Sequence, residues 1–106
     1  MSGGEAVARL AATIAARRGA DPEASGTARL LLDPERAARK FGEEAVEAVV
    51  EAVRGERERL VAEAADALYH LLVMCAARGV TLADVEGELA RREGLSGIAE
   101  KAGRGA

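Results

Sequence analysis

Residues 43–77, EEAVEAVVEAVRGERERLVAEAADALYHLLVMCAA, decide the fold of this 106-residue chain. Two apolar patterns of helical period flank Gly55, a residue that commonly ends a helix. The first pattern predicts a helix from Pro34 to Arg54 with Asp33 as its N-cap, and the second predicts a helix over 56–78. Because the connection between them is short, we expect the two helices to be antiparallel neighbours.

The rest of the chain also reads as helical. Apolar spacing predicts a first helix over 5–18 and a short helical turn over 27–32. Thr81, with Asp84 three residues on, is typical of a capping box, and the helix it begins should end near 93–94. Strong helix formers dominate, and no run of alternating β-branched residues suggests a strand. We therefore predict an all-α bundle of four to five helices.

Composition excludes several classes of protein. Apolar residues make up 49%, aromatic residues only 2%, and the formal net charge is −3. A base-stacking single-strand binder would carry more aromatic residues, and a duplex binder would carry a basic excess, so we expect no nucleic acid partner. The longest apolar run, 71–77, is too short to span a bilayer, and the first residues do not resemble a signal peptide. A single cysteine, Cys75, excludes an intramolecular disulfide.

These properties indicate one domain over 1–106, with an irregular tail over 94–106. We expect a cytoplasmic protein with no membrane association. A small domain with few aromatic residues has a limited core volume, so oligomerisation is expected to complete the bundle.

The negative charge is concentrated in the two central helices. Between Lys40 and Asp66 there are eight acidic and four basic residues, which leaves the remainder of the chain with a net charge of +1. The placement of these acids on the helices decides what they can do.

Each central helix is predicted to carry an apolar stripe with acids on another face. In the first helix the stripe is Val46, Val49, Val50 and Val53. Beside it, Glu44, Glu47 and Glu51 fall within an arc of about 60°. In the second helix the predicted core stripe is Val61, Ala64, Leu68, Leu71, Leu72 and Cys75. The opposite face carries Glu63, Asp66 and His70 and continues into Val73 and Ala77. A helix that is apolar on nearly all sides is expected to be buried, so Asp66 and His70 should point into packed surroundings.

Two carboxylate pairs at i, i+3 result, Glu44/Glu47 and Glu63/Asp66. On antiparallel neighbours the four carboxylates can face one another, and a folded protein tolerates such repulsion when a cation neutralises it. Ligands that are all carboxylate oxygens suit Mg²⁺ or Mn²⁺. The chemistry indicated is metal-assisted attack of water on a phosphoanhydride. The alternative for any such helix is a solvated acidic face, and Glu51, Glu56 and Glu58 are interpreted as ordinary surface charges.

Several segments together resemble one known family. Residues 40–47, KFGEEAVE, and 63–73, EAADALYHLLV, carry the EExxE and ExxD pattern of the all-α NTP pyrophosphatase superfamily, which includes MazG and the dimeric dUTPases. The segment 13–18, TIAARR, and the C-terminal 91–104, RREGLSGIAEKAGR, are similar to blocks of the phosphoribosyl-ATP pyrophosphatases of histidine biosynthesis. Gly26 and Gly103 depart from this pattern, where the family commonly has an aromatic residue and Ser.

The resemblance implies Mg²⁺-dependent hydrolysis of phosphoribosyl-ATP to phosphoribosyl-AMP and pyrophosphate by a homo-oligomer, usually a dimer. It implies four metal ligands, Glu44, Glu47, Glu63 and Asp66, with Glu43 as an auxiliary catalytic carboxylate. The positive residues expected to bind the substrate phosphates are Arg17, Lys40, Lys101 and Arg104, and Ser96 is expected to contact phosphate or ribose. His70 is interpreted as a residue that orients a carboxylate.

Two other functions remain open from the sequence. One is a MazG-like house-cleaning pyrophosphatase that acts on aberrant nucleoside triphosphates. The other is a non-enzymatic helical oligomerisation module with incidental acids. A ferritin-like di-iron bundle is disfavoured because it requires Glu-x-x-His pairs, whereas the second pair here is Glu63-x-x-Asp66.

Overall fold

The computed structural model describes residues 4–94, and every regular element in that range is a helix. The all-α prediction is therefore confirmed. The elements in chain order are α1 (Glu5–Ala16), α2 (Gly26–Leu31), α3 (Pro34–Arg54), α4 (Arg57–Ala77) and α5 (Leu82–Arg92). Each helix begins and ends within two residues of the boundaries predicted from the sequence.

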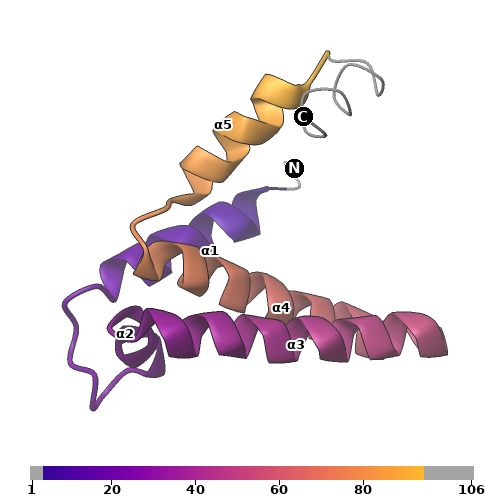
Figure 1. The fold of residues 1–106 in the computed structure, drawn as a ribbon, viewed down its shortest axis with the longest axis horizontal. Helices are drawn as coiled ribbons and strands as arrows, with labels where there is room; N and C mark the ends of the chain where they lie inside the picture. The colour runs from indigo at the N-terminus through magenta and orange to yellow at the C-terminus, as the bar shows by residue number, and fades with distance from the viewer. Residues whose placement is uncertain (1–3, 95–106) are drawn as a thin grey trace.

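The pairing of α3 with α4 follows from how the two helices end and begin. The Asp33 side chain accepts a hydrogen bond from the backbone N of Arg36 at 3.1 Å, which caps α3 one residue before Pro34. Gly55 ends α3 with a φ of 79°, a left-handed conformation that glycine adopts without steric cost. The chain then reverses within two residues, and α3 and α4 run side by side (Figure 1).

The buried core lies at one end of this helix pair, which we call the base. Its fully buried residues come from α1, α2, α3 and α4, and they are Ile14, Leu31, Ala37, Leu72 and Val73. In Figure 1, α1 and α2 lie at this end, and the α3–α4 pair extends beyond them. The base is thus the part of the bundle where all four helices bury apolar surface together.

The other end of the pair, which we call the tip, is not buried. The predicted apolar stripe of α3 is exposed: Val49 is 61% and Val53 is 82% accessible to solvent. On α4 the predicted core residues Val61 and Leu68 are also exposed. The prediction that α4 is a buried central helix is therefore wrong for its first half, because α1 and α2 do not reach that far.

Two features of α4 and α5 complete the architecture. Thr81 and Asp84 form the predicted capping box: the Asp84 backbone N donates to Thr81 Oγ1 at 3.1 Å, and the Thr81 N donates to Asp84 Oδ2 at 2.9 Å. No residue of α5 is buried, and the helix projects from the bundle (Figure 1). By length and composition alone α4 could cross a membrane. That is weak evidence, since core helices of soluble proteins pass the same test.

Candidate metal and phosphate site

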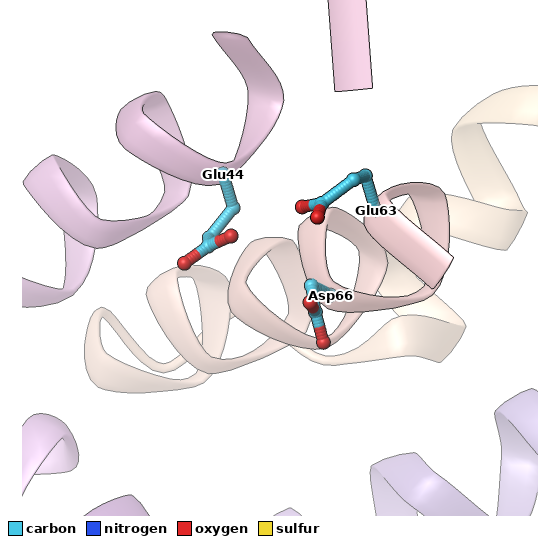
Figure 2. A group of neighbouring side chains, drawn as sticks. All are labelled: Glu44, Glu63 and Asp66. Atoms are coloured by element: carbon cyan, nitrogen blue, oxygen red, sulfur yellow. The ribbon is translucent and has the colours of Figure 1, made fainter. Parts of the chain in front are cut away.

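Carboxylates from α3 and α4 meet where the two helices lie against each other. One ligand oxygen from each of Glu44, Glu63 and Asp66 lies within 4.8 Å of the others. Figure 2 shows that Glu44 comes from one helix and the other two from its neighbour, with the Glu63 side chain directed toward Glu44. The structure therefore brings together acids that are about 20 residues apart in sequence, as the spacing predicted.

Glu47, the remaining predicted ligand, belongs to the same cluster. The pKa of Glu44 is raised above its ordinary value, first by a hydrogen bond with the Glu47 side chain and then by desolvation. The pKa of Glu63 is raised first by desolvation and then by the charges of Glu47 and Asp66. Because both pKa values respond to Glu47, its carboxyl group lies near those of Glu44 and Glu63, although Glu47 itself is an exposed residue.

The described residues supply too little positive charge and too few hydrogen-bond donors to compensate the carboxylates of the cluster. The atom Glu63 Oε2 is buried and has no hydrogen-bond partner among residues 4–94. One cation, Lys40, approaches: its Nζ lies 4.0 Å from Glu44 Oε1 and 3.4 Å from Glu43 Oε1. A single half-exposed lysine leaves the mutual repulsion of the four acids largely uncompensated. The donor set of carboxylate oxygens, with one oxygen buried and unpaired, fits a hard divalent cation.

Several predicted details of the site are corrected. Asp66 is exposed rather than packed, because α3 alone covers the first half of α4 and leaves the side that carries Asp66 open. Glu51, interpreted as a surface charge, is only 8% exposed. Its Oε2 lies 3.9 Å from Arg59 Nη1, while its Oε1 has no partner among the described residues. The signal was present in the sequence, since Glu51 shares the arc of Glu44 and Glu47.

Two neighbours border the carboxylates from α4. The rings of Tyr69 and His70 meet edge to face, with centroids 4.8 Å apart. Burial lowers the pKa of His70, and the Lys40 charge lowers it further, against the opposing effects of Asp66 and Glu43. His70 Nδ1 is buried without a partner in the described part of the chain. His70 therefore lies near the acids without a hydrogen bond to any of them in the described residues, and the carboxylate-orienting role stays a prediction.

The predicted substrate-binding residues are spread over the molecule. Lys40 lies at the cluster, whereas Arg17 is exposed at the end of α1. The adjacent Arg18 donates to the Ala76 carbonyl, near the C-terminal end of α4. Asp66 lies ten residues earlier on α4, about 15 Å away along the helix axis, so α1 does not bring Arg17 to the acids. Ser96, Lys101 and Arg104 lie outside the described residues.

One cavity in residues 4–94 lies away from the acids. It has a volume of about 250 Å³, lies between α1 and the end of α4, and is lined mainly by apolar residues such as Ile14 and Leu72. An apolar cavity without carboxylates offers no group that would act on a phosphoanhydride. The acidic cluster is therefore the better candidate for the functional site.

Comparison with known proteins agrees with this geometry. A model of the family described as phosphoribosyl-ATP pyrophosphohydrolase matches residues 7–93. A Cereibacter sphaeroides protein named phosphoribosyl-ATP pyrophosphatase is 72% identical, over 92% of this chain and 95% of its own length. Proteins of the same name from Paracoccus denitrificans and Dinoroseobacter shibae are 71% and 68% identical, over 91% and 92% of this chain and 90% and 97% of their own lengths.

Proposed function

Since the chain belongs to the phosphoribosyl-ATP pyrophosphohydrolase family, a family of hydrolases, we propose that it hydrolyses phosphoribosyl-ATP to phosphoribosyl-AMP and pyrophosphate in histidine biosynthesis. The observation that carries the proposal is the convergence of Glu44, Glu63 and Asp66 from two helices within 4.8 Å. Conversion of an ATP derivative agrees with the expected location in the cytoplasm.

We propose Mg²⁺ as the cofactor, with Mn²⁺ as a substitute, held by Glu44, Glu47, Glu63 and Asp66. The buried, unpaired Glu63 Oε2 and the raised pKa values of Glu44 and Glu63 support this ligand set. When bound, the cation would neutralise the phosphate charge and lower the pKa of a coordinated water.

The chain's own residues would contribute proton transfer and charge. Water attacks the α-phosphorus, the bond from that phosphorus to the bridging oxygen breaks, and pyrophosphate leaves. A carboxylate of the cluster accepts the proton of the attacking water, a role favoured by a raised pKa. Lys40 would balance negative charge on the departing phosphates, and Glu43, which pairs with Lys40, would hold that ammonium group in place.

The test is release of pyrophosphate from phosphoribosyl-ATP by the purified chain with Mg²⁺. Glu44→Gln and Asp66→Asn should each reduce kcat by about a thousandfold or more while circular dichroism shows unchanged helicity. Glu58→Gln is the matched control, because Glu58 is an exposed acid on α4 away from the cluster. Preference for ordinary or modified nucleoside triphosphates would favour the house-cleaning function instead.

We also propose that the working unit is a dimer of two copies of this chain. The exposed valines of the tip support this, because they form an apolar surface on α3 and α4 that the described chain does not cover. A second copy presenting the same face would bury it in a joint bundle. Sedimentation equilibrium at micromolar concentration should give twice the 11.0 kDa chain mass, and a monomeric mass would reject the dimer.

The remaining predicted contacts with substrate stay proposals. Arg17 and the C-terminal Ser96, Lys101 and Arg104 would have to reach the cluster from elsewhere, either through the tail or from the partner copy. The KM for phosphoribosyl-ATP, measured for a single substitution at each of these residues, would show which of them contact the substrate.

A further inference from the structure

A basic cavity lies immediately beside the acidic cluster. Its volume is about 200 Å³, and its lining residues come from α2, the first half of α3 and one position of α4. These residues are Gly26, Arg29, Leu30, Arg36, Lys40 and Tyr69. Three of the six are cations and none is acidic.

The cations are placed to receive an anion. Arg29 donates from Nε and Nη2 to the Pro22 carbonyl, at 3.2 and 3.0 Å, which fixes the plane of its guanidinium. Arg36 has no hydrogen bond or ion pair from its side chain to any of residues 4–94. Gly26 also lines the cavity, and a Cβ there would meet nothing within 4 Å. Guanidinium groups bind phosphate oxygens strongly because they offer parallel N–H donors.

The cavity and the cluster share one border. Arg36, Lys40 and Glu44 follow at intervals of four residues, so they lie on one face of α3 about 6 Å apart along the axis. Lys40 lines the cavity and also approaches Glu44 at 4.0 Å. Tyr69, whose hydroxyl is hydrogen-bonded to Thr27, lines the cavity one turn after Asp66. The charge on this face thus changes from positive to negative within two helical turns.

We propose that this cavity is a phosphate-binding subsite of the catalytic centre, with Arg29, Arg36 and Lys40 as its binding residues. The inference rests on the proposed function. A substrate with its phosphoanhydride at the carboxylates would place another phosphate group in the cavity. That group is either the terminal diphosphate that leaves or the 5-phosphate of the second ribose, and the same cations recognise both.

Direct binding to the metal-free protein tests the subsite without requiring turnover. Inorganic pyrophosphate and ribose 5-phosphate are titrated separately at low ionic strength by calorimetry. Arg36→Gln should raise the Kd of at least one of the two by about tenfold. Arg39→Gln, an exposed arginine of α3 outside the cavity, is the matched control and should change neither Kd by more than about twofold. Arg36→Lys should recover part of the affinity, since it restores the charge without the fork of donors.

The two titrations identify the phosphate source, because the ligand whose affinity depends on Arg36 is the occupant. Absence of binding by both ligands, or equal losses in Arg36→Gln and Arg39→Gln, would overturn the subsite. Arg36→Gln should keep the fold, because the Asp33 side chain accepts its hydrogen bond from the backbone N of residue 36 and not from the side chain. Circular dichroism verifies this.

Turnover separates this inference from the proposed function. Suppose that the wild-type protein releases no pyrophosphate from phosphoribosyl-ATP, and that phosphate affinity falls in Arg36→Gln but not in Arg39→Gln. This pair of results would reject the proposed function and retain the subsite. If the wild-type protein turns over phosphoribosyl-ATP and kcat/KM is equal in Arg36→Gln and Arg39→Gln, the subsite alone is rejected. The expected result is a tenfold lower kcat/KM in Arg36→Gln only.

Discussion

The base and the tip of the α3–α4 pair are built from the same two helices and the same kinds of residue, yet they differ in burial. At the base, Leu72 and Val73 are 7% and 0% exposed, because α1 and α2 cover them. At the tip, Val49 and Val53 are 61% and 82% exposed. The difference shows that an apolar stripe specifies which face of a helix is to be covered, but not whether this chain or another covers it.

The acidic cluster lies between these regions, and its position explains its mixed exposure. Glu63 is partly buried, whereas Asp66, less than one turn further on, is exposed. The site is thus anchored to the folded base and borders the face that is open in a single chain. Changes at the base should alter stability, and changes at the tip should alter association.

The largest effect is expected at the base. Leu72→Ala removes a buried side chain that also lines the apolar cavity, so it should lower the free energy of unfolding by about 3 kcal/mol. Urea denaturation measures this. Leu89→Ala on α5, where Leu89 is 58% exposed, is the control and should cost less than about 0.5 kcal/mol. Equal losses in the two variants would contradict the assignment of the core.

The next effect is expected at the tip. Val49→Asp should leave the fold of each chain intact, because the side chain is exposed in the single chain. It should halve the mass seen in sedimentation, because a charge buried in an apolar interface without a partner is strongly unfavourable. A variant that stays dimeric would place the interface elsewhere.

An intermediate effect is expected from pH in metal-free buffer. The pKa values of Glu44 and Glu63 are raised in the folded protein, so the native state binds protons more tightly than the unfolded state does. Stability from this source is present below the ordinary carboxyl pKa and is lost as the pH rises through the raised values. The Tm should fall over that window, and millimolar Mg²⁺ should restore it above the window.

Glu63→Gln provides the control for this pH dependence. The substitution removes one of the repelling charges, so the metal-free Tm of the variant should depend less on pH than that of the wild type. An unchanged profile would mean that the dependence arises outside the cluster.

The smallest effect is expected at Gly42, on the exposed side of α3 between base and tip. A Cβ there would meet nothing within 4 Å, so close packing within the described chain does not explain this glycine. Gly42→Ala should stabilise α3 by about 0.5 to 1 kcal/mol, measured by thermal unfolding. Destabilisation would indicate that a partner copy or the substrate approaches the backbone at this position.

The sequence predicted local structure well because local signals are strong. Asp33-Pro34, Gly55 and the Thr81 capping box placed helix ends to within two residues. The i, i+3 spacing of the acids predicted a cluster in which three of the four carboxylates, Glu44, Glu63 and Asp66, do converge. Burial was predicted less well. Val61 and Leu68 have the periodicity of core residues, but their exposure depends on how far α1 and α2 extend along the pair, which periodicity does not encode.

The same limit applies to single residues of the site. Glu51 lies in the same arc of α3 as Glu44 and Glu47, but its burial is a result of how α3 packs on α4. Arg29 and Arg36 were not assigned a role from the sequence, because the cavity they line forms only when α2 folds back beside α3. Tertiary contact between separate elements, rather than spacing along one helix, determines these positions.

The turn at Gly55 has a consequence for how the site forms. Glu47 and Glu63 are joined by a single short connection, so closing it brings the acidic side chains together at a small cost in loop-closure entropy. Contacts so near in sequence are typical of fast-folding helical proteins. The carboxylates of the cluster would therefore meet early in folding, before α5 packs, and they would repel one another from that stage onward. A divalent cation would then act on the folding reaction itself as well as on the finished enzyme: it should speed refolding in stopped-flow experiments in proportion to how completely the α3–α4 hairpin is formed in the transition state.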